Sequence, residues 1–313
     1  MDERRREIAR FIEPFRVKPG STVTLEKDFD PAFKAGVEKK DQGEEMLRQG
    51  VELLSEYQAR LAAQDTHAVL VVLQAIDAAG KDGTIRHVMS GVNAQGVAVH
   101  SFKVPSAEEL GHDFLWRYQQ RLPGRGEIGI FNRSHYEEVL VVRVHPENLD
   151  RERVPAEAKR KGVWRRRYRE INDWEHYLVD NGIRVVKLFL NLSKEEQRIR
   201  LLRRLDLPDH NWKFSAADVQ ERSYWGDYQR AFSDMLSHTS TEWAPWHVIP
   251  ADRKWFARIS AALVIVDALM EIDPRFPALD ADARARLAEV RAQLEAEAPS
   301  GQAPDPFADR RPR

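Results

Sequence analysis

The sequence contains no cysteine, which excludes disulfide bonds and thiolate metal sites. It also lacks a long hydrophobic run, because the longest apolar-rich helical segment, residues 261–270, is interrupted by Asp267 and is too short to span a bilayer. The first seven residues are mostly charged and have no apolar core of the kind that a secretion signal needs. These absences predict a soluble cytoplasmic protein without a membrane partner.

An excess of charge of either sign is missing as well, since 49 lysines and arginines nearly cancel 50 aspartates and glutamates. Without a global positive field we expect no nucleic acid partner, and any polyanion must be bound by a local basic groove. The chain has 313 residues, of which 42% are hydrophobic, so it can bury a large core in one main domain.

Apolar segments alternate with helical patterns from residue 69 onward. Continuous apolar strands separated by helices are typical of a parallel sheet that is buried on both faces and carries its sites at the carboxyl ends of the strands. The pattern therefore predicts an α/β fold. The expected strands are residues 69–73, 96–102, 127–131 and 184–190, with a candidate final strand at 248–249.

Three domain divisions follow from composition. Residues 1–30 form an arm with a short strand at 22–25, residues 31–277 the main domain, and residues 278–313 a tail that is helical over 280–297 and then disordered. Helices are expected over 34–64 and 112–121. Ser193 is expected to cap an arginine-rich helix. This helix and a second helical pattern over 212–232 together predict a mobile basic lid at about 200–232.

The most informative segment is residues 69–84, where an apolar strand enters a loop of small residues that ends in Gly80 and Lys81 before a helix. Backbone N–H groups at a helix start, together with a lysine, form a phosphate site. The loop departs from the G-x-x-x-x-G-K-[ST] pattern because Ala75 and Asp82 replace the first glycine and the hydroxyl. The alternative is a tight turn in which Gly80 supplies a positive φ and Lys81 is solvated.

Asp77 favours the phosphate site over the plain turn. A carboxylate inside such a loop would repel phosphate unless a divalent cation lay between them. Asp77 is therefore a candidate ligand of Mg²⁺. The residues of this loop expected to bind phosphate or nucleotide are Ala78, Ala79, Gly80, Asp82, Gly83 and Thr84.

A second constellation follows the strand at 127–131. Asn132 occupies the place where P-loop proteins put an acid beside the metal, and Glu137 could restore the missing charge. Arg133 would project toward phosphate oxygens, which suit its planar fork. The alternative is that Asn132 only caps a helix at 133–138.

Weaker signals lie elsewhere. The basic run 159–169 is either a solvated helix face or, with its aromatic residues, a surface for single-stranded nucleic acid. Asp113, Trp116 and Arg117 could hold a base or a phosphate, or Trp116 could simply be packed. Four of the ten histidines show no metal-binding spacing, so core or surface roles are expected for them. These four are His87, His100, His112 and His135.

Together, these segments resemble the polyphosphate kinase 2 family, which transfers phosphoryl groups between inorganic polyphosphate and nucleotides. The matching words are Leu-Gln-Ala-Ile-Asp-Ala-Ala-Gly-Lys-Asp-Gly-Thr at 73–84, Phe-Asn-Arg-Ser-His-Tyr-Glu at 131–137 and Trp-Lys-Phe at 212–214. Similarity extends from about residue 16 to about residue 277. The resemblance implies a P-loop-kinase-like fold with three α/β/α layers, a parallel sheet and a helical lid.

The resemblance also implies roles for individual residues. Asp77, Lys81 and Arg133 are expected to be catalytic, and Asp77, Asn132 and Glu137 to bind Mg²⁺. Asparagine at 132 followed by Glu137 is similar to the branch that phosphorylates both AMP and ADP. The residues implied to contact phosphates from the lid are Arg204, Lys213 and Arg222. One departure is His210, which stands where a lysine is usual and is only partly charged at neutral pH.

The expected reaction is in-line attack by a phosphate oxygen of AMP or ADP on the end of polyphosphate, with ATP as the product from ADP. Two rivals stay open: a nucleoside monophosphate kinase that uses ATP as donor, and a non-catalytic polyanion-binding regulator. A homo-oligomer is possible through the long N-terminal helix and residues 261–270, which ordinary core packing explains equally well.

Overall fold

The computed structural model describes residues 3–207, 216–299, 303 and 305, with residues 216–218 described by their backbone alone. The chain divides into two units, residues 1–275 and 276–313. Lys213 and His210, both assigned to the lid from sequence, lie outside the described residues, as does most of the chain after residue 299.

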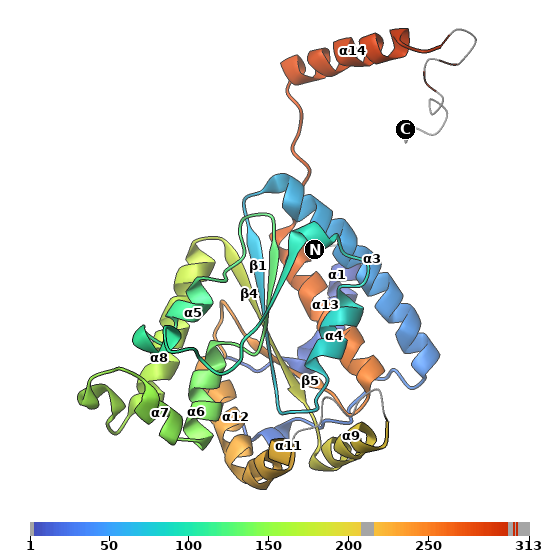
Figure 1. Cartoon of the computed structure of the whole chain (residues 1–313). Coiled ribbons are helices and arrows are strands. Elements are labelled where there is room, and N and C mark those ends of the chain that lie inside the picture. Colours follow the sequence, from blue (N-terminus) through green and yellow to red (C-terminus); the bar gives the residue numbers. More distant parts are fainter. Residues whose placement is uncertain (1–2, 208–215, 300–302, 304, 306–313) are drawn as a thin grey trace. The chain divides into compact units, whose positions relative to one another are not determined.

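The first unit is built on one sheet of five parallel strands in the order β2-β3-β1-β4-β5 (Figure 1). All five expected strands are confirmed. Val71 at the centre of β1 pairs with Ile130 on one side and Val186 on the other, and all three side chains are buried. The strands are β1 (Ala68–Ala75), β2 (Val97–Ser101), β3 (Ile128–Asn132), β4 (Ile183–Asn191) and β5 (Trp246–Pro250).

Helices cover both faces of this sheet, which confirms the three-layer α/β/α fold. Alternate residues of β1 point to opposite faces, so Val69 and Val71 join one core cluster while Leu70 and Val72 join the other. The first face is covered by α1 (Glu3–Ile12), α3 (Lys40–Gln64), α4 (Lys81–Val88) and α13 (Lys254–Ile272), and the second by α8 (Val163–Asp180) and α12 (Trp225–Thr239) (Figure 1).

Shorter helices connect these elements. The α-helices are α2 (Leu25–Asp28), α5 (Trp116–Gln119), α6 (Val141–Val144), α7 (Glu147–Arg151), α9 (Lys194–Asp206) and α11 (Ala216–Glu221). The 3₁₀ helices are η1 (Glu13–Phe15), η2 (Ala94–Gly96), η3 (Glu109–Gly111), η4 (His135–Val139), η5 (Ala156–Lys159) and η6 (Arg222–Tyr224).

Three local predictions are wrong. The long helix begins at Lys40 and not at residue 34, because Ala35 and Gly36 have positive φ angles of 46° and 82°. The segment 22–25 is no strand, since the N–H groups of Val23 and Leu25 donate to serine hydroxyls of α12 at 2.8 and 3.0 Å. Of residues 112–121 only α5 is α-helical, after a turn in which Asp113 Oδ1 accepts the N–H of Leu115 at 2.9 Å.

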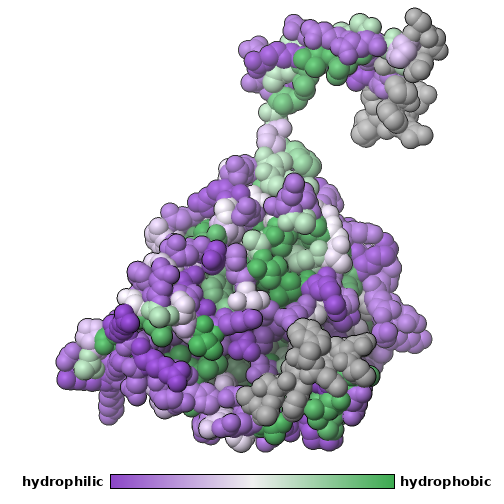
Figure 2. Space-filling model, viewed as in Figure 1, coloured by the Kyte–Doolittle hydropathy of each residue, from purple (hydrophilic) through white to green (hydrophobic). Residues whose placement is uncertain are grey.

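The N-terminal segment is more ordered than an arm. Ile8 and Ile12 of α1 are buried against α13, and Arg5 Nε donates to Asp267 Oδ1 at 3.2 Å. The predicted N-cap of α9 is confirmed, because Ser193 Oγ accepts the N–H of Glu196 at 3.1 Å. On the face shown in Figure 2, hydrophilic residues predominate and the hydrophobic ones gather in smaller areas.

The second unit contains α14 (Ala281–Ala296), which confirms the helix expected in the tail. Asp280 caps it, since its Oδ1 accepts the N–H of Ala283 at 2.7 Å. Among the residues that the structure describes, none of the helices combines the length and the apolarity needed to cross a bilayer.

Candidate active site

The loop between β1 and α4 lies at the carboxyl edge of the sheet. Gly80 has a φ of +102° and precedes the first residue of α4, so the positive φ expected there is confirmed. Ala78 also has a positive φ, of 66°, which an alanine adopts only at a cost. The first intrahelical bond runs from Thr84 N–H to the Gly80 carbonyl at 2.9 Å, which leaves the preceding N–H groups available to an anion.

Lys81 is folded into this loop and is not a solvated surface lysine, so that alternative is wrong. Its Nζ donates to the Ala75 carbonyl at 2.9 Å, and the side chain is half-buried. Burial lowers the pKa of Lys81, while the carboxylate of Asp77 acts in the opposite direction. The ammonium group is thus held where the strand ends, beside the N-terminus of α4.

The second constellation reaches the same place from the neighbouring strand. Leu73 of β1 and Asn132 of β3 are partners in the sheet, so the segments that follow them emerge side by side. Arg133 Nη2 donates to Asp77 Oδ1 at 2.8 Å, and its Nη1 lies 3.8 Å from Glu137 Oε2. The structure therefore brings together three residues predicted to act at one site.

Asn132 joins the two constellations directly. Its Nδ2 donates to Asp82 Oδ1 at 2.7 Å and to Ser101 Oγ at 3.3 Å. The alternative role as a helix cap is wrong, because the cap of η4 is Ser134, whose Oγ accepts the N–H of Tyr136 at 3.3 Å. Asn132 thus fixes the start of α4 against the end of β3.

The carboxylates near the loop suit a magnesium ion that is shared with a substrate. No group of three or more histidine, aspartate or glutamate side chains in the described part of the chain could hold a metal by itself. Mg²⁺ usually takes only one or two protein carboxylates and completes its shell with phosphate oxygens and water. Asp77 and Glu137, both within reach of Arg133, supply such a pair, and burial raises the pKa of Glu137.

Helix α9 supports the loop from outside through two residues to which no role at the loop was assigned from the sequence. Arg200 is buried, and its Nη1 donates to the carbonyls of Ala79 and Ala78 at 2.7 and 3.2 Å. Gln197 Nε2 donates to the carbonyl of Asp77 at 3.0 Å. A signal was available, because positions 197 and 200 lie on one face of a helix that directly follows a strand.

The predicted lid residues differ in how closely they approach this loop. Arg222 Nη1 donates to Gln197 Oε1 at 2.9 Å and to the Lys194 carbonyl at 2.7 Å. Arg222 is thus connected to the Asp77 carbonyl through the side chain of Gln197. Arg204 lies half-buried in the last turn of α9.

Arg117 is packed into the segment that follows β2. Its Nη2 donates to the Lys103 carbonyl at 2.9 Å, its Nε lies 3.3 Å from Glu109 Oε1, and its guanidinium lies over the Phe102 ring. Trp116 stacks on His112 with ring centroids 4.0 Å apart. The side chain of Arg117 borders a cavity of about 370 Å³, which is the space that a base or a phosphate would have there.

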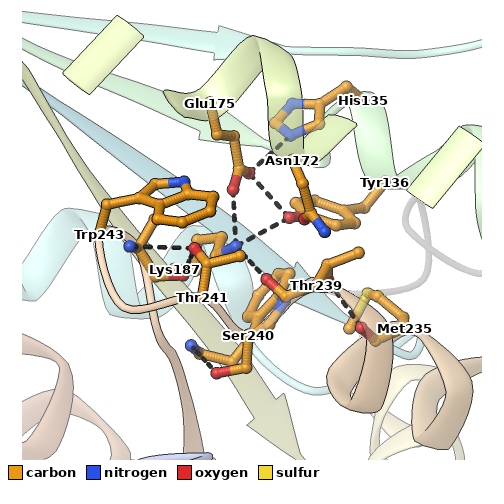
Figure 3. Close-up of polar contacts among 12 residues, drawn as sticks. His135, Tyr136, Asn172, Glu175, Lys187, Met235, Thr239, Ser240, Thr241 and Trp243 are labelled. Atoms are coloured by element: carbon orange, nitrogen blue, oxygen red, sulfur yellow. Dashed lines mark hydrogen bonds and ion pairs between the residues drawn. The ribbon is translucent and has the colours of Figure 1, made fainter. Parts of the chain in front are cut away.

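A buried polar cluster anchors η4, the 3₁₀ helix that begins two residues after Arg133 (Figure 3). Lys187 Nζ donates to Glu175 Oε2 at 2.6 Å and to the Tyr136 hydroxyl at 3.0 Å, and His135 Nε2 lies 3.1 Å from Glu175 Oε1. Burial lowers the pKa of both Lys187 and His135. Burial alone would raise the pKa of Glu175, but Lys187 and His135 lower it on balance. His135 is therefore a core residue, as expected.

The central strand of this parallel sheet leads into a glycine-lysine loop at the start of a helix, and an arginine from the next strand lies beside that loop. This arrangement defines a P-loop-kinase-like protein. The chain belongs to the polyphosphate kinase 2 family, whose model, described as Polyphosphate kinase 2, matches residues 37–277.

Named relatives and a solved structure agree with this assignment. The chain is 51% identical over 284 residues to an ADP-polyphosphate phosphotransferase of Rhodopseudomonas palustris, covering 90% of this chain and 97% of the relative. It is 45% identical over 270 residues to an AMP/ADP-polyphosphate phosphotransferase of Meiothermus ruber, covering 85% and 96%. The crystal structure of Polyphosphate Kinase 2 from Arthrobacter aurescens superposes with a TM-score of 0.80 at 40% identity, covering 89% of this chain and 95% of that one.

Proposed function

We propose that this protein transfers a phosphoryl group reversibly between inorganic polyphosphate and AMP or ADP. The observation that carries the proposal is the convergence of Lys81, Arg133 and Asp77 at the carboxyl edge of the sheet. Family membership and the names of the two relatives support the choice of polyphosphate as donor and of adenine nucleotides as acceptors.

In the proposed reaction, a terminal phosphate oxygen of the nucleotide forms a bond to the end phosphorus of the polymer. The bond from that phosphorus to its bridging oxygen breaks, and the shortened polymer leaves with the electron pair. Lys81 and Arg133 hold the non-bridging oxygens and stabilise their charge in the transition state. No strong base is needed, because an ionised phosphate is already the nucleophile.

We also propose Mg²⁺ as the cofactor, held by Asp77 and Glu137 with the side-chain oxygen of Asn132. When bound, the ion would neutralise phosphate charge and align the two substrates. Asp77 then has two roles, since before substrate binds it also positions Arg133 through their ion pair.

The lid would consist of about residues 200–232. Arg222 and Arg204 from the described part, and Lys213 from sequence, would contact phosphates when it closes. ATP is then the product from ADP. A cytoplasmic location, a homo-oligomer and the absence of nucleic acid or membrane partners remain predictions.

The test supplies AMP, polyphosphate and Mg²⁺ without ATP and measures ADP and ATP by chromatography. The proposal predicts both products and none when the divalent ion is chelated. A monophosphate kinase would instead form ADP only when ATP is the donor, and a polyanion-binding regulator would form no nucleotide product from either donor. Either result would overturn the proposal.

A further inference from the structure

Glu221, the last residue of α11, accepts two hydrogen bonds near the candidate active site. His145 Nε2 lies 3.0 Å from Glu221 Oε2, and the Tyr228 hydroxyl donates to the same oxygen at 2.9 Å. Because an ionised carboxylate can only accept, Nε2 of His145 carries the hydrogen of the first bond. The side chain of His145 is 15% exposed and that of Glu221 33%. These three residues are called the Glu221 cluster below.

Glu221 and its neighbour Arg222 bond to different segments of the site. Glu221 contacts His145, which directly follows α6 in the segment that continues from β3 and η4. Arg222 Nη1 donates at 2.9 Å to Gln197 Oε1 of α9, and the same glutamine donates to the backbone of the loop between β1 and α4. In Figure 1, α11 lies between α6 and α9. Residues 221 and 222 therefore connect the two segments that carry the candidate catalytic residues.

Helix α11 has little else to hold it in position. It has six residues (Ala216–Glu221), and a helix of this length is not stable by itself. Of the side chains that the structure describes in α11, those of Val219 and Gln220 are exposed and bury little surface. The hydrogen bonds of Glu221 therefore fix the end of α11, and with it the start of η6, where Arg222 lies.

The Glu221 cluster lies close to the proposed metal ligands. Burial raises the pKa of Tyr228, and the hydrogen bond and charge of Glu221 add to this effect. The negative charges of Glu137 and Asp77 also raise the pKa of Tyr228, and charges act on each other mainly within about 10 Å at ordinary ionic strength. The ring of Tyr228 stacks on Phe232 in the core, with centroids 5.8 Å apart. The cluster thus joins the core to the edge of the site.

The present partners of Arg222 are uncharged. Its Nη1 donates to the Lys194 carbonyl at 2.7 Å and to the side-chain amide oxygen of Gln197. A charged phosphate oxygen is a stronger acceptor than either, by roughly a factor of two. Exchanging these acceptors for phosphate requires only the side chain of Arg222 to move if its backbone stays in place. Glu221, the residue before it, supplies that anchor.

We propose that Glu221, held by His145 and Tyr228, is a positioning residue that orients Arg222 toward the phosphates of the substrate. This inference rests on the proposed function, in which Arg222 contacts phosphate. Glu221 itself does not bind substrate in this arrangement, because a carboxylate repels phosphate and its Oε2 already accepts two hydrogen bonds. Its effect on the reaction therefore passes through Arg222.

The test measures kcat and KM for polyphosphate, with AMP and Mg²⁺ present, in two variants of Glu221. Glu221→Leu removes both hydrogen bonds, and we expect kcat/KM to fall about tenfold. Glu221→Gln keeps a side-chain oxygen for His145 and Tyr228, so its kcat/KM should stay within about threefold of the wild type. His145→Phe keeps the ring contact with Tyr224 but loses the N–H donor, and should fall between the two.

A double-mutant cycle separates positioning from a general structural role. Arg222→Gln alone should lower kcat/KM about tenfold or more. Adding Glu221→Leu to it should lower kcat/KM by less than a further factor of about two, since no arginine is left to orient. If Glu221→Leu does not fold, His145→Phe takes its place in the cycle. Thermal unfolding of each variant verifies that it is folded.

Glu147→Leu is the matched control. Glu147 Oε1 lies 3.5 Å from His145 Nδ1, but the side chain is 64% exposed and is not bonded to α11. The control makes the same substitution at a second carboxylate beside His145 and should keep wild-type kinetics.

Four results would overturn the positioning role. These are wild-type kinetics in Glu221→Leu, wild-type kinetics in Arg222→Gln, an equal loss from Glu221→Leu with and without Arg222, or an equal loss in the control Glu147→Leu. Failure of the proposed function looks different, because the wild-type protein itself would then form no nucleotide product from polyphosphate.

Discussion

Arg133 Nη2 donates to Asp77 Oδ1 at 2.8 Å, which joins two residues 56 positions apart in the sequence. Each neutralises the other in the free protein. Arg133 has a positive φ of 64°, and its N–H donates to the Leu73 carbonyl at 3.2 Å, so the backbone holds the side chain over the loop. Phosphate binding would exchange the Asp77 carboxylate for phosphate oxygens while Arg133 stays in place.

Replacing Arg133 with alanine should lower kcat strongly and leave the fold intact. An arginine that stabilises a transferring phosphoryl group contributes on the order of 10³–10⁵ in rate, and this side chain is 41% exposed and supports no core packing. Steady-state kinetics with AMP and polyphosphate, together with thermal unfolding, measure both effects. A folded Arg133→Ala protein with near-normal kcat would refute the assigned role.

Replacing Asp77 with asparagine should weaken the binding of Mg²⁺. The substitution keeps the size and one oxygen of the side chain but removes the charge that attracts Mg²⁺. We expect the Mg²⁺ concentration for half-maximal rate to rise about tenfold or more, equivalent to at least about 1.4 kcal/mol. A magnesium titration of initial rates measures this. If the curve of Asp77→Asn coincides with that of the wild type, Asp77 is no ligand.

Replacing Lys81 with methionine should nearly abolish turnover with little loss of stability. Methionine keeps the apolar stem and loses the ammonium that bonds to the Ala75 carbonyl, and this is the group that would contact the phosphates in the proposed reaction. A loss of a single charge-assisted contact costs about 1.5–3 kcal/mol in binding alone, and transition-state charge adds to it. Full activity in a folded Lys81→Met protein would contradict the phosphate role of this residue.

Much of the site was predictable because its signals are local. The strand, the small-residue loop and Lys81 are consecutive in the sequence, and the ends of parallel strands meet at one edge of a sheet. That rule places Arg133 beside Asp77 without any knowledge of side-chain contacts. Membership in a known family also reinforced the assignment of both segments.

The parts that were missed depend on contacts between distant residues. Arg200 donates to the Ala79 carbonyl although the two residues are 121 positions apart in the sequence, and Val23 donates to Ser237 at a separation of 214 positions. Nothing in the residues near either partner reveals such a bond. Lys187 is a similar case. From the sequence alone a lysine on a strand is expected at the surface, whereas in the structure it is paired with Glu175 in the core.

Replacing Lys187 with methionine should destabilise the protein by about 3–5 kcal/mol, because Glu175 would be left buried and charged without its partner. The double variant Lys187→Met/Glu175→Gln should be more stable than this single variant, since neither charge remains. Urea unfolding of the wild type, the two single variants and the double variant completes the double-mutant cycle. A double variant that is less stable than Lys187→Met would show that the cluster matters through something other than charge pairing.

The stability of the protein should depend on pH in part because of His247 on β5. Burial, reinforced by the positive charge of Arg16, lowers the pKa of His247 from 6.5 to about 3. At His247 the unfolded chain therefore binds a proton more readily than the folded protein does. The contribution of the neutral His247 side chain to the free energy of unfolding is thus complete above pH 6.5 and is lost as the pH falls toward 3. Between pH 8 and pH 5 the wild type should lose on the order of 2 kcal/mol that His247→Gln does not lose. Urea unfolding of both proteins at the two pH values measures the difference, and parallel losses in the two proteins would show that His247 does not cause it.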